Sequence, residues 1–191
     1  MNILLEKFLH DNWYPDYALY AYYMGALFWI ITYAMVIYRI VKHKFLEFPA
    51  IVIAANVSWE LLWGFVFNFA FGGPILQYAW RLGFFLDVFM LYSAFRFAKD
   101  QVDIPHLKEW MKFTVPAVFL FFLGAIYFYV IEGFDLPMGF NSGMFLNLFM
   151  GVLCLLFLLR RPNYPFSLWI GIGRFIATDV FFTIYIYTHY L

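Results

Sequence analysis

The stretch from Phe48 to Ala70 reads FPAIVIAANVSWELLWGFVFNFA, and it decides the fold class of the chain. A helix needs about 20 mostly apolar residues to cross the roughly 30 Å of hydrocarbon in a bilayer. This stretch has that length, and Pro49 stands at its start, where a helix tolerates proline. Its single formal charge is Glu60. The stretch therefore predicts a transmembrane helix with one carboxyl group near its middle.

The whole chain of 191 residues has the composition of a membrane protein. It is 65% hydrophobic and 26% aromatic, and twelve Lys and Arg balance twelve Asp and Glu. Globular domains are about 45–50% apolar and about 25% charged, so a soluble enzyme, a disordered chain, a collagen and a disulfide scaffold are excluded. The zero net charge offers no basic face to a nucleic acid. We expect membrane lipids and lipophilic small molecules as partners.

Five further stretches have the length and apolarity of a membrane span. Residues 1–191 are therefore predicted to form a single all-α domain, a polytopic transmembrane helical bundle. Pro165 opens the last span, and Gly72, Gly73 and Pro74 form a turn between the second and the third. The six predicted spans cover about residues 17–41, 48–70, 75–97, 113–131, 140–159 and 165–190.

Lysines and arginines gather on one side of these spans. Nine of them flank the loops after the first, third and fifth spans, whereas the opposite side carries Lys7. Because cytoplasmic loops hold the excess of Lys and Arg, both termini are predicted to be non-cytoplasmic. We expect a multi-pass protein of the cell membrane if it is bacterial, or of the endoplasmic reticulum if it is fungal. The nine are Arg39, Lys42, Lys44, Arg96, Lys99, Lys108, Lys112, Arg160 and Arg161.

Three carboxyl groups fall near the midplane of their predicted spans: Glu60, Asp87 and Asp179. A charge at this depth costs at least about 2.5–3.5 kcal/mol and marks a functional site by default, pairing between helices being the alternative. Three carboxylates at one level of a dry site cannot all be ionised, so at least one is expected to be protonated. A protonated carboxyl group in an apolar pocket is a general acid. Arg81 and Arg174 lie off this plane and are expected to pair between helices or to snorkel.

Common metal-binding residues are scarce in the predicted spans. Cys154 is the one cysteine and lies in an apolar run, and the four histidines lie in or near predicted loops or termini. We therefore expect no metal and no cofactor. The chemistry must come from carboxylates, arginines, amides and aromatic rings.

Aromatic rings flank each predicted acid at helical spacing. Rings are so common here that chance places one beside most residues, yet the chain has seven Trp and two of them flank Glu60. Rings around a proton donor suit a cation without a counter-ion, because a desolvated cation–π contact contributes about 2 kcal/mol or more. The predicted substrate-binding residues are Asn56, Trp59, Trp63 and Phe67 beside Glu60, Trp80 and Phe84 beside Asp87, and Phe182 beside Asp179.

The segment from Asn56 to Glu60, Asn-Val-Ser-Trp-Glu, resembles the Asn-x-x-Trp-Glu signature of the integral-membrane terpene cyclases. These act in fungal meroterpenoid and indole-diterpene pathways and have smaller bacterial relatives. Asp179, followed by Tyr185, resembles the second acidic position of this family. The resemblance implies an all-helical membrane enzyme that binds a prenylated substrate, protonates its terminal epoxide or alkene, and closes rings through carbocations without a metal.

Carried over to this sequence, the resemblance makes Glu60 the proton donor or its partner and Asp179 the second essential acid. It makes Asn56 the residue that orients Glu60 by hydrogen bonding. Asp87 receives no role from the resemblance, and many family members have seven spans where six are predicted here. From the residues and the resemblance together, the predicted catalytic residues are Glu60, Asp87 and Asp179.

Other functions fit parts of the same pattern. Arg81, Asp87 and Tyr92 recur as Arg174, Asp179 and Tyr185 in a span of opposite direction, as in a small secondary transporter with an inverted three-plus-three repeat. The remaining span pairs do not reinforce that repeat. A sterol-isomerase-like enzyme would use similar acids and rings on another substrate, whereas a lipid-binding or aromatic-ligand-binding bundle would not require three midplane carboxylates. The substrate head group, the prenyl length and the oligomeric state stay open.

Overall fold

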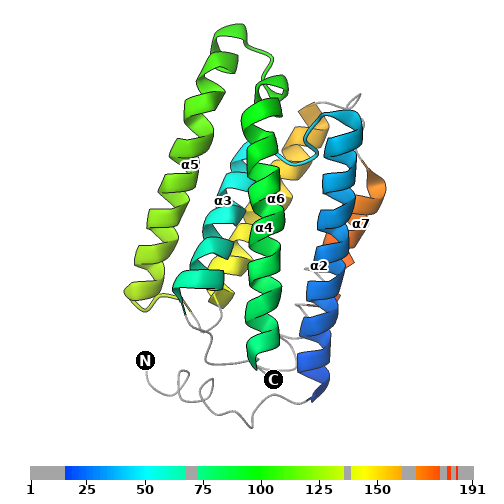
Figure 1. Ribbon diagram of the computed structural model, residues 1–191, viewed down its shortest axis with the longest axis vertical. Helices are drawn as coiled ribbons and strands as arrows, with labels where there is room; N and C mark the ends of the chain where they lie inside the picture. The colour runs from blue at the N-terminus through cyan, green and yellow to red at the C-terminus, as the bar shows by residue number, and fades with distance from the viewer. Residues whose placement is uncertain are drawn as a thin grey trace.

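The computed structural model describes residues 16–67, 73–135, 139–160, 167–176, 180, 181 and 184. Every regular element in this part of the chain is a helix, which confirms the predicted all-α bundle (Figure 1). The α-helices are α2 (Asp16–His43), α3 (Ala50–Leu61), α4 (Gly73–Phe97), α5 (Pro105–Ile131), α6 (Phe140–Arg160) and α7 (Leu168–Phe175). A π-helical turn, η1 (Leu62–Val66), continues α3, and a 3-10 turn, η2 (Ala98–Gln101), follows α4.

Within the described residues, three helical stretches are long and apolar enough to cross a bilayer: Tyr23–His43, Pro105–Ile131 and Phe140–Arg160. The stretch Ala50–Val66 is apolar but shorter. Helix α5 begins at Pro105 instead of near residue 113, and α7 covers the first part of the sixth predicted span, most of whose remainder lies outside the described residues. Proline suits the first turn of a helix because it lacks the N–H that would be unpaired there. Residues 105–112 thus form helical turns, where the sequence predicted a loop.

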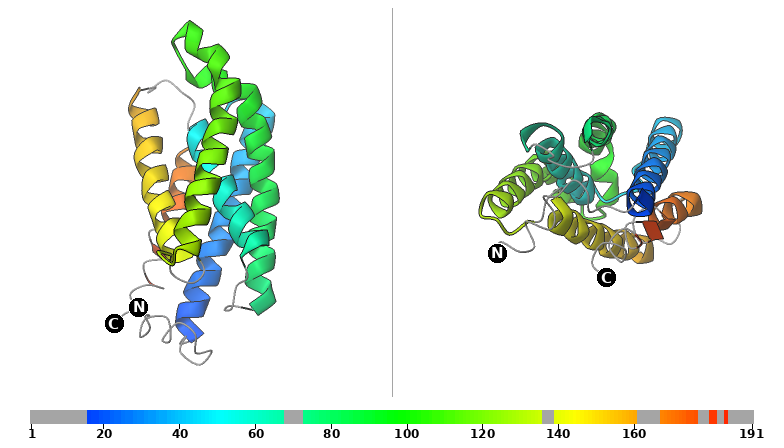
Figure 2. Two further views of the ribbon diagram at one scale, coloured as in Figure 1. Left: turned by 90° about the vertical axis from the view of Figure 1, so that its left-hand side faces the viewer. Right: turned by 90° about the horizontal axis from the view of Figure 1, so that it is seen from below.

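Helix α3 has neighbours on three sides. It packs against α4 and α5 and also contacts α6, as the end-on view in Figure 2 shows. Its small residues Ala54, Ala55 and Ser58 are fully buried, so neighbouring backbones can approach closely. Ser58 Oγ lies 2.9 Å from the carbonyl oxygen of Phe119 in α5. Helix α2 packs against α4 and α7, which leaves a region between α2, α3 and α4 in which the candidate site lies.

A buried polar cluster, here called the end cluster, joins the helices at the upper end of the bundle in Figure 1. The Glu47 carboxylate accepts a hydrogen bond from Arg39 Nε and a second, at 3.2 Å, from the N–H of Ser167 before α7. The Gln101 amide donates to the Phe48 carbonyl at 2.7 Å and accepts from the N–H at the start of α3 at 3.0 Å. The end cluster therefore fixes α2, α3, α7 and η2 relative to one another.

The two arginines inside the predicted spans both reach a carbonyl oxygen of another element. Arg81 Nε donates to the carbonyl of Gly64 in η1 at 3.0 Å, and its guanidinium lies 5.5 Å from the centre of the Phe65 ring. Arg174 Nη2 donates to the carbonyl of Asn147 in α6 at 2.9 Å. Both arginines thus connect two helical elements. This agrees with the first of the two arrangements expected from the sequence, interaction between helices.

Candidate functional site

Four polar side chains meet in the interior of the bundle, and we call them the central network. Tyr33 comes from α2, Asn56 and Glu60 from α3, and Asp87 from α4. The spacing of Asn56 and Glu60, four residues apart, places them on one face of α3. Tyr33, Glu60 and Asp87 are each at most 1% exposed. Polar groups so deeply buried need partners, and the network supplies them.

The hydrogen bonds of the central network have a fixed direction. The Asn56 amide donates one hydrogen to Asp87 Oδ2 at 2.6 Å and the other to the hydroxyl oxygen of Tyr33. The Tyr33 hydroxyl in turn donates to Glu60 Oε1 at 3.2 Å. The Glu60 and Asp87 carboxyl groups lie next to each other and interact directly. The network therefore runs from one amide donor to a pair of acids.

The electrostatics of this pair are unusual because it has no cationic partner among the described residues. Two carboxylates only accept hydrogen bonds, so a hydrogen bond between two carboxyl groups requires a proton on one of them. Two neighbouring carboxylates in a dry interior also repel each other, which opposes the ionisation of both acids. Chemically, the pair can hold a proton and release it to an acceptor that reaches Glu60.

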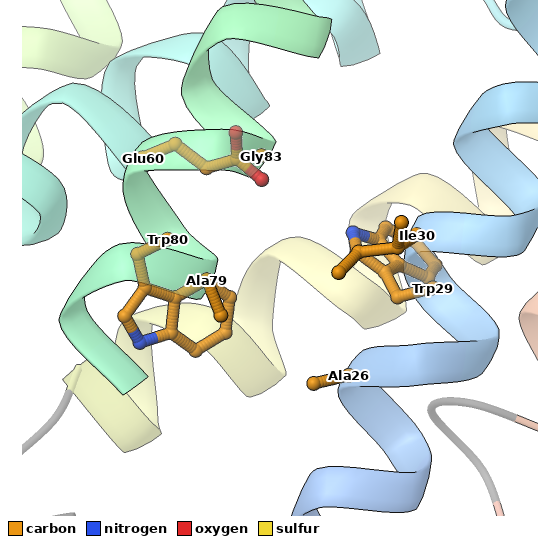
Figure 3. Close-up of a pocket in the computed structure, with 7 residues that line it drawn as sticks. All are labelled: Ala26, Trp29, Ile30, Glu60, Ala79, Trp80 and Gly83. Carbon is orange, nitrogen blue, oxygen red and sulfur yellow. The ribbon is translucent and has the colours of Figure 1, made fainter. Parts of the chain in front are cut away.

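A small, partly open pocket lies beside Glu60. Glu60 supplies the one ionisable side chain of its lining, and the remaining lining is apolar or aromatic. Gly83 leaves room for the acid, since a Cβ atom there would lie 2.8 Å from Glu60 Oε1. Figure 3 shows Glu60 beside Gly83, with Ala79 and Trp80 of α4 on one side and Ala26, Trp29 and Ile30 of α2 on the other.

The predicted aromatic residues divide between the pocket and its surroundings. Trp80 lines the pocket, and Trp59 packs edge-on against it with ring centres 4.9 Å apart. Trp59 also donates from Nε1 to Ser142 Oγ in α6 at 2.8 Å, so its ring faces away from Glu60. Trp63 and Phe67 extend this cluster, their ring centres 5.2 Å apart. These rings support Trp80 from behind rather than line the pocket described.

Phe84 packs in another direction, against Phe65 at 5.0 Å between ring centres. It does not line the pocket. Asn56 does not bond Glu60 directly; it acts through Tyr33 and Asp87, which corrects the contact implied by the resemblance. The predicted acid Asp179 and the predicted ring Phe182 lie outside the described residues.

Sequence reasoning missed Tyr33, Trp29 and Gly83. Tyr33 and Trp29 are four residues apart on α2, with ring centres 5.2 Å apart, so helical spacing could have grouped them. Nothing in their own span marked that face as special, because the span carries no charge near them. Their importance comes from α3 and α4, which lie opposite.

The model of the Pyr4-like transmembrane terpene cyclases matches residues 7–190. Searches among curated protein sequences and among solved structures found no match. The matched range covers nearly the whole chain and includes the segment Asn56 to Glu60, so the resemblance drawn from that segment is confirmed. The chain belongs to the family of Pyr4-like transmembrane terpene cyclases.

Proposed function

We propose that this protein cyclises a polyprenylated substrate and that Glu60 delivers the initiating proton from the Glu60–Asp87 pair. The observation that carries the proposal is the position of Glu60. Its buried carboxyl group is the ionisable side chain on the wall of an apolar pocket. A second acid lies behind it, and the described residues offer this pair no counter-ion. A general acid needs this combination of a retained proton and direct access to the reacting atom.

The reaction balances without a co-reactant. The Glu60 proton goes to the epoxide oxygen, where an O–H bond forms as the C–O bond breaks, or to a terminal alkene carbon, where a C–H bond forms. The resulting carbocation is attacked by the next π bond of the prenyl chain, and each attack closes a ring. The last cation loses a proton to a base, so the product is an isomer of the substrate and the acid pair can be restored.

Two indoles are placed to stabilise the cations. Trp29 and Trp80 approach the pocket from opposite helices, α2 and α4 (Figure 3). An indole face attracts a cation most strongly in a water-free site, and it does not capture the cation as a carboxylate would. The supporting rings Trp59 and Trp63 hold Trp80 in place from the side of α6.

We further propose that the bundle is multi-pass and that its upper end in Figure 1 faces the cytoplasm. Helices α2, α4 and α6 each carry basic residues in their last turn, and the positive-inside rule assigns such ends to the cytoplasmic side. In a Cys154→Ser background, His106→Cys should react with an impermeant thiol reagent from the cytoplasmic side. Glu132→Cys should react from the opposite side, and the reverse pattern would refute this orientation.

The activity can be tested on purified protein in nanodiscs. Farnesylated and geranylgeranylated aromatic compounds and their terminal epoxides are incubated with the wild type and with Glu60→Gln, and products are separated by mass and retention time. We expect a product of unchanged mass that is cyclised and that the variant does not form. Failure to cyclise either class of compound, together with proton-coupled uptake into proteoliposomes, would favour the transporter instead.

A further inference from the structure

We infer that Tyr33 is a positioning residue of the proton donor, a role that rests on the proposed function. Its hydroxyl is the link between Asn56 and Glu60, and it comes from α2, which carries neither acid. Tyr33 is 1% exposed and packs between Trp29 and the core, so its ring has little freedom to turn. The hydroxyl therefore holds a fixed place beside Glu60 Oε1.

The direction of the hydrogen bonds follows from counting hydrogens. The Asn56 amide has two, and Asp87 Oδ2 and the Tyr33 oxygen accept them. A phenol hydroxyl has one hydrogen, and with its oxygen already accepting from Asn56, that hydrogen points to Glu60 Oε1. The Tyr33 hydroxyl thus donates to Glu60 Oε1, and the Asn56 amide donates to Asp87 Oδ2.

This arrangement decides where the transferable proton can lie. The remaining oxygens, Glu60 Oε2 and Asp87 Oδ1, are buried and accept no hydrogen bond from another described side-chain or backbone donor. We place the proton of the pair on these two oxygens, because each of the other two already accepts a hydrogen bond that protonation would weaken. Tyr33 keeps Glu60 Oε1 occupied and so directs the proton to Oε2.

Tyr33 also acts during proton transfer. As Glu60 releases its proton, negative charge develops on its carboxyl group, and a hydrogen bond to an ionised acceptor is roughly twice as strong as a neutral one. The Tyr33 hydroxyl therefore stabilises the transition state more than the bound substrate, which raises kcat and leaves KM unchanged. A purely structural tyrosine would not separate the two constants.

The test compares Tyr33→Phe with Tyr38→Phe in the same helix, whose hydroxyl is 3.2 Å from Lys42 Nζ and whose side chain is exposed. We expect Tyr33→Phe to lower kcat roughly 10²-fold, the loss typical of a misplaced reacting group, with KM close to wild type. The melting temperature should fall modestly, because one Asn56 N–H loses its acceptor. The pH profile of kcat should move, whereas Tyr38→Phe should match the wild type in every respect. A Tyr33→Phe enzyme with wild-type kcat, or one whose activity falls only in step with its folded fraction, overturns the inference.

A second readout keeps the inference independent of catalysis. The infrared C=O stretch of a protonated carboxyl group responds to its hydrogen bonds, and it can be recorded in detergent without substrate. Tyr33→Phe should shift this band and Tyr38→Phe should leave it in place. If the wild type forms no cyclic product, the proposed function fails, yet the band shift still decides whether Tyr33 orients the acid pair; an unmoved band refutes its role.

Discussion

The central network and the end cluster each bury a glutamate, but the two glutamates have opposite kinds of partner. Glu47 in the end cluster is 5% exposed, and Glu60 in the central network is 1% exposed. Burial raises the pKa of Glu47 above its ordinary value, but Arg39 and the N–H of Ser167 oppose this rise by stabilising the carboxylate. Glu60 has a phenol and a second acid as its partners instead.

This difference separates a structural acid from a reactive one. A guanidinium and a backbone N–H stabilise the ionised form of a carboxyl group, and such a group serves to join helices. An acid paired with another acid keeps a proton that can leave when a substrate arrives. Both motifs cost desolvation, and the central network borders a pocket. The reactive acid of this bundle is therefore the one that has no cationic partner among the described residues.

The largest effect is expected from replacing the two glutamates by glutamine in turn. Glu60→Gln removes the proton donor and should lower turnover roughly 10²–10⁴-fold, the usual contribution of a general acid. The amide has the shape of the acid, so the melting temperature should change little. Glu47→Gln is the matched variant and should affect stability more than turnover. Equal activity of the two purified variants would show that Glu60 is no more important for turnover than Glu47.

A second large effect is expected at Asp87. Asn at this position can accept from Asn56 with its oxygen and donate to Glu60 with its amide, so every hydrogen bond is kept without a proton. Glu60 would then be held as a carboxylate and could not act as an acid. We expect Asp87→Asn to fold normally and to lose turnover roughly 10²-fold. Wild-type turnover in this variant would show that Glu60 needs no acidic partner.

A smaller effect is expected at Gly83, which touches Glu60 without any hydrogen bond. In Gly83→Ala the new Cβ would lie 2.8 Å from Glu60 Oε1, so the carboxyl group must move away from α4. We expect kcat to fall about tenfold or more, because catalysis is sensitive to shifts of this size. Gly124→Ala is the control, since its Cβ would meet no atom within 4 Å. A Gly83→Ala enzyme as active as the control would place the reacting proton elsewhere.

The smallest effect on activity, and a clear one on stability, is expected at Arg39. Arg39→Met leaves the buried Glu47 without its cation, which should cost about 1–3 kcal/mol of unfolding free energy. The central network lies at another depth of the bundle and should work normally at a permissive temperature. Thermal unfolding in detergent, with turnover measured on the same sample, separates the effect on stability from the effect on activity. A loss of kcat without a loss of stability would contradict the assignment of Arg39 to a purely structural cluster.

The stability of Arg39→Met should depend on pH and should fall as the pH rises. The folded-state pKa of Glu47 lies above its ordinary value, so the folded protein holds this proton more tightly than the unfolded chain. Stability is then fully present at low pH and falls as the pH rises through the raised pKa. Without Arg39 the pKa rises further, so the melting temperature of Arg39→Met should decline more steeply with rising pH than that of the wild type. An identical decline in both proteins would mean that Arg39 does not influence Glu47.

Much of the fold and part of the site could be predicted from composition and spacing. The lengths of the apolar stretches predicted the helices. The depth of each acid in its span predicted that Glu60 and Asp87 lie at one level, where the structure places them side by side. These predictions succeed because bilayer thickness and helix rise constrain depth along a single axis. Rotation about that axis is less constrained. Tyr33 and Gly83 were missed because their roles depend on which helix lies opposite.

The aromatic stripe shows the same limit. Constant helical spacing put Trp59 and Trp63 on the face of Glu60, whereas in the structure they face α6. Helix α3 is buried on nearly every side, so each of its faces has a neighbour and hydrophobicity cannot select one. The π-helical turn at Leu62–Val66 also changes the spacing after Glu60, and its hydrogen bond from Phe67 N–H to the Leu62 carbonyl has no sequence signature.

The most direct measurement asks whether the Glu60–Asp87 pair holds a proton at pH 7. Infrared spectra of the purified protein in nanodiscs, labelled with ¹³C in its carboxyl groups, are compared among the wild type, Glu60→Gln, Asp87→Asn and Glu47→Gln. We expect the wild type and Glu47→Gln to share the C=O band of a buried protonated acid, and both variants of the pair to lose it. A wild-type spectrum without this band, or a band that survives in Glu60→Gln and Asp87→Asn and disappears in Glu47→Gln, would contradict a proton held by the central network.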